Sequence, residues 1–229
     1  HERPAAIAAL VSRPALARVL LENLAKPTAR NAIPRPDLTP VFARQIRSFN
    51  DAALTARLAE VWGESRESPA DKQKLIADLK ARLTPEFIRR GDPSRGRALY
   101  ARVCAGCHKL YGEGSILGPD LTGSGRHDLG YLIEIIADPS AVVAAEHQLV
   151  VMTLQDGRVL NGMISAKSER TVTVRLMDQE MTLDRAAITK QEQLPVSLMP
   201  EGLLTALDDQ QVGDLVSYLM SPAQVPLPK

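Results

Sequence analysis

Apolar residues recur every three or four positions through the first third of the chain, which predicts a series of short helices. Pro14 falls where a first turn tolerates it. Asn50-Asp51 and Ser68-Pro69-Ala70-Asp71 are start signals, and Ile33-Pro34-Arg35-Pro36-Asp37 breaks the pattern. The predicted helices lie at 4–11, 14–25, 54–62 and 70–83.

A second helical pattern begins near Gly91 and leads directly into a pair of cysteines. Asp92-Pro93 caps a predicted helix that ends at about Val103, one residue before Cys104. After a glycine-rich loop, two more amphipathic helices are predicted, at 128–137 and at 208–220. Asp208 or Asp209 would cap the last of them.

The hydrophobic period changes from helical to two between Gln148 and Ile188. Valines at 172 and 174 alternate with threonines at 171 and 173, the pattern of a half-buried strand. Asp156-Gly157 lies between two apolar runs and predicts a tight hairpin. The sequence therefore predicts four short antiparallel strands that form a small sheet or barrel.

The composition limits the class of protein more than its activity. The chain has 229 residues, 45% of them hydrophobic, and a formal net charge of +1, which suits a globular protein of one or two domains. Lysines and arginines are scattered, which argues against nucleic acid or an anionic membrane surface as partner. No stretch approaches the ~20 apolar residues of a membrane span. The chain starts at His1 within a helical pattern, which favours a piece of a longer protein.

The sequence Cys104-Ala-Gly-Cys107-His108 carries the chemistry. Two thiols at this spacing can each add to one vinyl group of a haem, and the following histidine can bind the iron. A disulfide framework needs more cysteines, and a structural zinc site needs four ligands. A thioredoxin-like pair would follow a strand and precede a helix, whereas here a predicted helix precedes it and a loop follows. The motif therefore predicts one covalent haem c.

Further motifs in the same order resemble known haem proteins. The run from Gly96 through CAGCH, Gly118-Pro119-Asp120-Leu121 and a final amphipathic helix resembles a class I cytochrome c. More narrowly, GPDLTGSGR (118–126), QDGRVLNG (155–162) and SLMPEGL (197–203) resemble the haem-binding domain of large planctomycete and verrucomicrobial proteins. In those proteins the domain often follows HEAT-like repeats and a sugar-dehydrogenase-like propeller. The resemblance covers about residues 90–221 well and residues 1–85 loosely.

The resemblance implies a mainly α fold with two regions. A HEAT-like helical region would occupy residues 1–88, and a class I cytochrome c fold would occupy 89–222, followed by a tail at 223–229. A small antiparallel β module at 148–190 interrupts the cytochrome fold, which is a departure from the compact class I pattern. The helix crossing that closes this fold should bring Gly96 and Tyr100 against Leu215 and Tyr218.

The sixth ligand of the iron is expected to be Met199. In class I cytochromes this ligand is a methionine on the loop before the last helix, and Pro200 would stiffen that loop here. His127 and His147 are the rivals, although His127 follows a loop at a helix start and His147 suits a solvated or capping role. The remaining methionines are expected to pack in the core or lie at the surface.

Two further residues have expected roles around the haem. A metal-bound histidine usually donates its other ring N–H to a carbonyl or carboxylate. By resemblance, the Pro119 carbonyl would accept that bond from His108. Arg126 could pair with a haem propionate, or could be an ordinary solvent-exposed arginine.

The expected function is electron transfer by one covalently bound haem. The module would accept electrons from a dehydrogenase domain or partner and pass them to another cytochrome, without being an enzyme itself. A haem sensor or a peroxidase-like protein with an open sixth position is the alternative, and an interaction scaffold with a structural haem is a third hypothesis. Because haem attachment occurs outside the cytoplasm in bacteria, a periplasmic or comparable location is expected.

Overall fold

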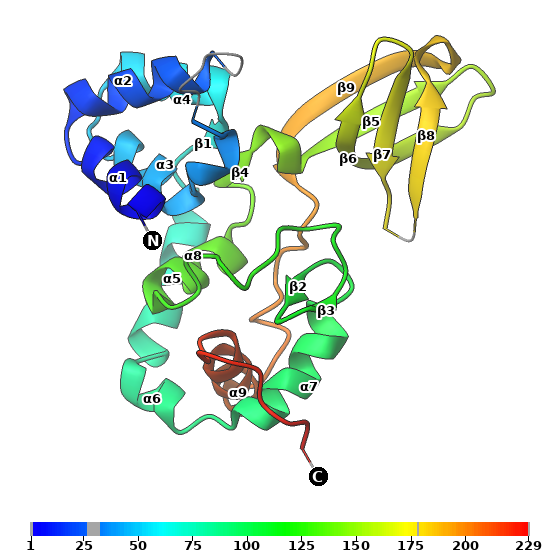
Figure 1. The fold of residues 1–229 in the computed structure, drawn as a ribbon. Helices are drawn as coiled ribbons and strands as arrows, with labels where there is room; N and C mark the ends of the chain where they lie inside the picture. Colours follow the sequence, from blue (N-terminus) through cyan, green and yellow to red (C-terminus); the bar gives the residue numbers. More distant parts are fainter. Residues whose placement is uncertain (1, 27–32, 178, 229) are drawn as a thin grey trace. The chain divides into compact units, whose positions relative to one another are not determined.

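The structure, a computed structural model, describes residues 2–26, 33–177 and 179–228, which belong to two compact units (Figure 1). The first unit extends to Glu67 and also includes Ser140–Ala145. The second unit consists of Ser68–Pro139 and the chain from Glu146 onward. Residues 68–88 thus fold with the second unit, whereas the domain limit predicted from sequence lies at 88/89.

Short helices build the first unit. They are α1 (Glu2–Leu10), α2 (Pro14–Leu24), α3 (Pro40–Arg47) and α4 (Ala52–Val61). Pro14 opens α2, and Asp51 caps α4 by accepting hydrogen bonds from the N–H groups of Ala53 and Leu54. The sequence pattern did not predict α3. The buried core of the first unit includes Val11, Leu20, Leu21, Ile46, Leu54, Leu58 and Trp62.

A distant segment completes this first unit. Strand β1 (Gly63–Ser65) pairs antiparallel with β4 (Val142–Ala144), and side chains of β4 enter the same core. The buried indole of Trp62 donates its Nε1–H to the carbonyl of Leu38 over 2.6 Å. The core of the first unit therefore includes residues that follow the haem motif in sequence.

The second unit contains the remaining helices and a small hairpin. Its helices are α5 (Ala70–Arg82), α6 (Pro85–Arg89), α7 (Pro93–Val103), α8 (Leu129–Ala137) and α9 (Asp209–Leu219), and its hairpin is β2 (Lys109–Leu110) with β3 (Glu113–Gly114). Aspartates 92, 128 and 208 cap α7, α8 and α9 with their side chains. Helix α5 starts where its signal predicted, but its N-cap is Pro69, which makes no side-chain cap.

Helices α7 and α9 cross at close range, as the sequence predicted. A Cβ on Gly96 would lie 2.0 Å from the carbonyl oxygen of Asp214, so only glycine fits without a shift of the backbone. One turn further along α7, the rings of Tyr100 and Tyr218 are tilted with their centroids 5.5 Å apart. The two helices are therefore packed backbone to backbone at this point.

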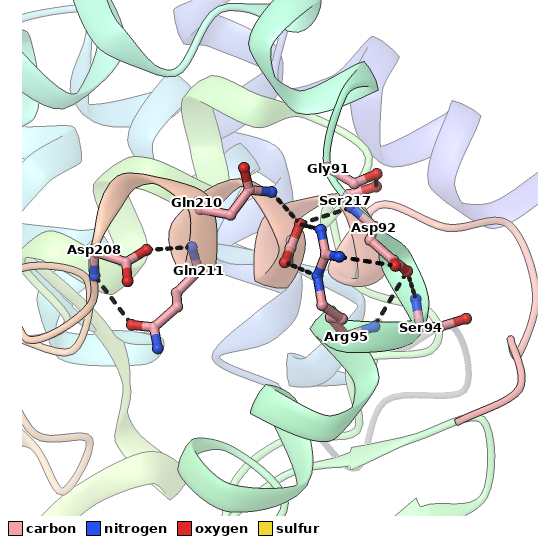
Figure 2. Close-up of polar contacts among 9 residues, drawn as sticks. Gly91, Asp92, Ser94, Arg95, Asp208, Gln210, Gln211 and Ser217 are labelled. Atoms are coloured by element: carbon pink, nitrogen blue, oxygen red, sulfur yellow. Dashed lines mark hydrogen bonds and ion pairs between the residues drawn. The ribbon is translucent and has the colours of Figure 1, made fainter. Parts of the chain in front are cut away.

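A buried carboxylate reinforces the same crossing. Asp214 is 2% exposed and accepts hydrogen bonds from the N–H of Asp92, from Arg95 Nε and from Gln210 Nε2, at 2.7, 2.7 and 2.8 Å. These groups converge on the carboxylate from the start of α7 and from α9 (Figure 2). Burial acts to raise the pKa of Asp214, but the hydrogen bonds from Arg95, Asp92 and Gln210 outweigh it and leave the pKa below its ordinary value.

The β module has five strands rather than the predicted four. These are β5 (Gln148–Leu154), β6 (Val159–Lys167), β7 (Thr171–Arg175), β8 (Glu180–Asp184) and β9 (Ile188–Ser197), in the order β8-β7-β6-β5-β9 (Figure 1). The predicted hairpin at Asp156-Gly157 joins β5 to β6, with Gly157 at φ +85°. The sequence pattern missed β9 because most of its side chains are exposed, and the module extends to 197 rather than 190.

The sheet of the β module curls around its own core. Residues 159–162 of β6 pair with β5, whereas residues 163–167 pair with β7. A Cβ on Gly162, at the changeover, would lie 2.3 Å from the carbonyl oxygen of Arg175. The bend encloses a small core made of Val150, Met152, Leu154, Val172, Val174 and Leu183. No helix in the described part of the chain is long and apolar enough to cross a membrane.

Replacing Gly96 should reveal how tight the α7–α9 crossing is. Gly96→Ala should lower the free energy of unfolding by about 1–3 kcal/mol because the methyl group meets a backbone carbonyl that cannot turn aside. The higher helix propensity of alanine acts in the opposite direction. Urea titration measures the change. Gly123→Ala is the control, since a Cβ there meets nothing within 4 Å; equal losses in both variants would contradict the interpretation.

The ionised carboxylate of Asp214 should stabilise the protein only at pH values above its folded-state pKa. At neutral pH, Asp214→Asn should lower the free energy of unfolding by about 2 kcal/mol, because the hydrogen bonds lose their charged acceptor. The depressed folded-state pKa means that this contribution is complete above the ordinary value of 3.8 and is lost as the pH falls through the folded-state value. Urea titrations at several pH values should therefore show the gap between wild type and variant closing in acid. Glu169→Gln, in an exposed turn, should leave no such gap.

Candidate functional site

Helix α7 delivers the two cysteines and the histidine into one tight turn. The N–H groups of Cys104 and Ala105 both donate to the carbonyl of Tyr100, at the end of the helix. The N–H groups of Cys107 and His108 both donate to the carbonyl of Cys104, over 3.0 and 2.9 Å. Both thiols are half-buried and neither forms a disulfide. The turn therefore brings the backbone of all three residues of the motif together.

The surroundings of the thiols argue against a thioredoxin-like redox pair. Burial raises the pKa of Cys104 to about 12, with a further contribution from the nearby Cys107. Burial also raises the pKa of Cys107. A redox-active pair needs a thiol whose pKa is lowered, so that the thiolate is present at neutral pH. Both thiols are therefore protonated at neutral pH. Cys104 also packs against an apolar cluster, which suits attachment to a hydrophobic group.

The imidazole of His108 is oriented for metal binding. Its Nδ1 lies 2.9 Å from the carbonyl oxygen of Pro119, and since a carbonyl can only accept, Nδ1 carries the proton. The lone pair is then on Nε2, the atom free to bind a metal. Burial lowers the pKa of His108, against the opposite effect of the Pro119 bond, and this favours the neutral ring that a metal requires. The contact with Pro119 is the one expected from sequence.

The loop after the motif is shaped around the His108 ring. A Cβ on Gly118 would lie 2.6 Å from Cε1 of His108 and 2.8 Å from its Nδ1. The N–H of Gly118 donates to the carbonyl of Cys107 over 2.6 Å, and that of Leu121 donates to the carbonyl of Lys109 over 2.8 Å. Tyr100 also donates its hydroxyl to the carbonyl of His108, over 2.7 Å. The ring is thus held on one side by a fixed backbone cradle.

Arg126 is buried, with 3% of its surface exposed, so the solvent-exposed alternative considered from sequence is wrong. Its Nη1 donates to the carbonyls of Leu219 and Ser221, at the end of α9, over 2.7 and 2.5 Å. The guanidinium lies 5.0 Å from the ring centroid of Tyr111, whose hydroxyl donates to the same Ser221 carbonyl. No described residue accepts a hydrogen bond from the buried Nε of Arg126. A carboxylate is one acceptor that would satisfy this donor.

Met199 lies between the end of β9 and the start of α9. It is half-buried and packs against the apolar cluster that also includes Cys104, Tyr111 and Leu121. The Ser197 hydroxyl accepts a hydrogen bond from the N–H of Met199 over 3.1 Å. These contacts put the methionine loop in the same core as the motif.

The two rival histidines lie in different surroundings. His127 is exposed, whereas His147 is half-buried in the short 3-10 turn η2 (Ala145–His147) directly before β5. Burial lowers the pKa of His147, and the charges of His108 and Arg175 lower it further, against Glu146. His147 therefore lies within electrostatic range of the site, which its assignment to a solvated or capping role did not anticipate.

Arg175 is a residue of the site that the sequence did not point to. Its Nη1 donates to the carbonyl of Ile116, in the loop that leads to Gly118, over 3.3 Å. Its Nε donates to Glu180 over 3.2 Å. Arginine at the end of a half-exposed strand is common, so the sequence carries no signal for this contact.

A family model described as Cytochrome c matches residues 93–222, which is more than half of the chain. The chain belongs to the cytochrome c family. The match covers this cytochrome from the first residue of α7 to just beyond α9, so it contains the motif, the loop around His108, the β module and Met199. No curated protein matches the chain.

Members of this family carry a covalently bound haem c with iron, and the residues of this cytochrome fit that group. The two cysteines are the only ones in the chain, so one haem can be attached through thioether bonds. The free Nε2 of His108 could bind the iron. As a cytochrome c domain, the chain is a haem protein with an electron-transfer role, of a kind typically found outside the cytoplasm.

Gly118 offers a direct test of the cradle around His108. In Gly118→Ala the methyl group would collide with the imidazole, turn it away from the Pro119 carbonyl and weaken its bond to the iron by about 10- to 100-fold. The measurement is a urea titration of the ferric protein, followed by the absorption change when the iron loses its histidine. The variant should change at lower urea, whereas Gly123→Ala should match the wild type. Coincident curves for Gly118→Ala would contradict this interpretation.

Proposed function

We propose that this cytochrome domain is an electron-transfer module that takes electrons from a dehydrogenase domain or partner and passes them to another cytochrome. The bound haem supplies a one-electron couple at its iron. The observation that carries the proposal is the hydrogen bond from His108 Nδ1 to the Pro119 carbonyl, directly beside the two thiols. This bond supports His108 as an axial ligand, because it orients the ring and leaves the Nε2 lone pair free.

The protein's contribution is to hold the coordination sphere still. Cys104 and Cys107 would fix two points of the porphyrin, and His108 would approach the iron from a ring that cannot turn. A site held by packing and by hydrogen bonds around its ligands changes little between oxidation states. Such rigidity favours rapid electron exchange over substrate chemistry, and we assign no catalytic residue in this domain.

Met199 is proposed as the sixth ligand. Its loop is fixed at one end by the Ser197 hydroxyl and further along by an ion pair between Glu201 and Lys72 of α5, at 2.5 Å. Pro200 restricts the backbone between these two points. A thioether stabilises ferrous iron relative to a second imidazole and so raises the reduction potential.

Arg126 is proposed to bind a haem propionate. The support is its buried Nε, which has no acceptor among the described residues, on a guanidinium that is otherwise held by backbone carbonyls. A buried cation that faces a propionate would form a charge-assisted hydrogen bond. The same arginine would then link the haem edge to the end of α9.

The narrower assignments belong to the same proposal. They are the planctomycete and verrucomicrobial type of haem domain, a class I fold, a HEAT-like origin for the N-terminal helices and a periplasmic location. The domain limits at 1–88, 89–222 and 223–229 also stay predictions. Their support is the order of motifs in the sequence together with the short helices that precede α7.

The proposal is tested by spectroelectrochemistry on protein made with a haem-attachment system. Ferric and ferrous forms should both be low-spin, a single one-electron wave should describe the titration, and the reduced protein should not bind carbon monoxide. Absence of covalent haem, or an irreversible wave, would refute electron transfer. Ready binding of carbon monoxide would instead support the sensor or peroxidase-like alternative with an open sixth position.

Removal of the proposed sixth ligand should lower the reduction potential. Met199→Ala should shift it down by on the order of 100 mV, within the range that axial ligands span, and should abolish the near-infrared band of ferric iron bound to a thioether. Met177→Ala is the matched control because that side chain is 66% exposed in the β module. If Met199→Ala keeps both the band and the potential, Met199 is not the ligand.

A further inference from the structure

The pairing of β5 with β9 places a second potential iron ligand at the same end of the β module as Met199. Strands β5 and β9 are antiparallel neighbours, and the first residue of β5, Gln148, pairs with the last residue of β9, Ser197. His147 directly precedes Gln148, and Met199 follows Ser197 by two positions. Paired residues in an antiparallel ladder lie about 5 Å apart. His147 and Met199 therefore leave the β module at the same end.

Both sides of this junction are fixed by hydrogen bonds. Across the ladder, Gln193 donates its Nε2–H to Gln148 Oε1 over 2.9 Å. Beyond the ladder, the Ser197 hydroxyl holds the N–H of Met199 at 3.1 Å, so the chain turns immediately after the strand. On the other side, His147 is the last residue of the turn η2. These bonds fix the backbone on both sides of the junction, where the pairing of β5 with β9 has a register shift between Gln148 and Leu149.

The same end of the β module reaches the motif that holds the haem. Arg175, at the end of β7, donates to the Ile116 carbonyl two residues before Gly118. The half-buried His147 lies within electrostatic range of Glu146, of Arg175 and of the proximal His108. The residue that precedes β5 is therefore on the side of the β module that contacts the loop around His108.

We infer that His147 is a reserve axial ligand, able to take the sixth position of the haem iron when Met199 is removed or displaced. This inference rests on the proposed ligation by His108 and Met199. The exchange breaks one iron–sulfur bond and forms one iron–nitrogen bond, with no transfer of an electron. A neutral imidazole binds through its unprotonated nitrogen, so no proton is released in the exchange. The consequence is a sixth position that closes again before an external ligand can use it.

Four variants of the full chain test the inference: Met199→Ala, Met199→Ala/His147→Ala, Met199→Ala/His127→Ala and His147→Ala. Met199→Ala should remain low-spin in both oxidation states, with the spectrum of two imidazole ligands. Adding His147→Ala should make it high-spin, and added imidazole should restore the low-spin spectrum. Adding His127→Ala should change nothing, because His127 is exposed on the loop before α8. His147→Ala alone should keep the wild-type spectrum.

Carbon monoxide affinity provides the second readout. The reduced Met199→Ala protein should bind it about tenfold or more weakly than the double variant without His147, because the imidazole must first be displaced. A high-spin Met199→Ala protein with the same affinity as the double variant would overturn the inference. So would a low-spin spectrum that survives the loss of His147. By contrast, an unchanged thioether band in Met199→Ala, or its loss in His147→Ala alone, would refute the proposed sixth ligand itself.

Discussion

The close crossing of α7 and α9 is the constraint on which the haem site depends. Because Gly96 has no side chain, the backbone of α7 can approach the carbonyl of Asp214, and the buried carboxylate of Asp214 fastens the start of α7 to α9. Both helices lead into the haem site. Helix α7 ends in the cysteine motif, while α9 begins after the methionine loop and ends in the carbonyls that Arg126 binds. A shift at the crossing would displace the proximal ligand and the methionine loop relative to each other.

Local chemistry made much of the second unit predictable from sequence. Helices α7, α8 and α9 were predicted because each has an apolar stripe and an aspartate that caps its first turn. The hairpin at Asp156-Gly157 was predicted because its turn needs a positive φ. Strand β9 was missed because it is formed by pairing with the distant strand β5. Its own side chains are mostly exposed and show no hydrophobic pattern. Elements that depend on interactions between near neighbours in the chain were thus predicted, whereas the strand that depends on a distant partner was missed.

The residues of the candidate site also fall into those that the sequence identified and those that it did not. The attachment motif and its histidine are contiguous, so spacing alone identified them. The burial of Arg126 was not predictable from its residue type, because its acceptors are backbone carbonyls more than ninety positions away. The position of His147 depends on the register of two strands that are about forty residues apart in sequence. Sequence patterns carry residue types and periods, whereas these two contacts depend on how distant segments are aligned.

The pairing of β1 with β4 has a consequence for how the chain matures. Val142 and Ala144 are buried in the core of the first unit, yet the ribosome makes them after Cys104, Cys107 and His108. The N-terminal helices therefore cannot complete their core until the attachment motif and α8 have already emerged. The first unit is therefore completed by a segment that lies beyond the attachment motif, unlike successive domains that fold one after another from the N-terminus during synthesis.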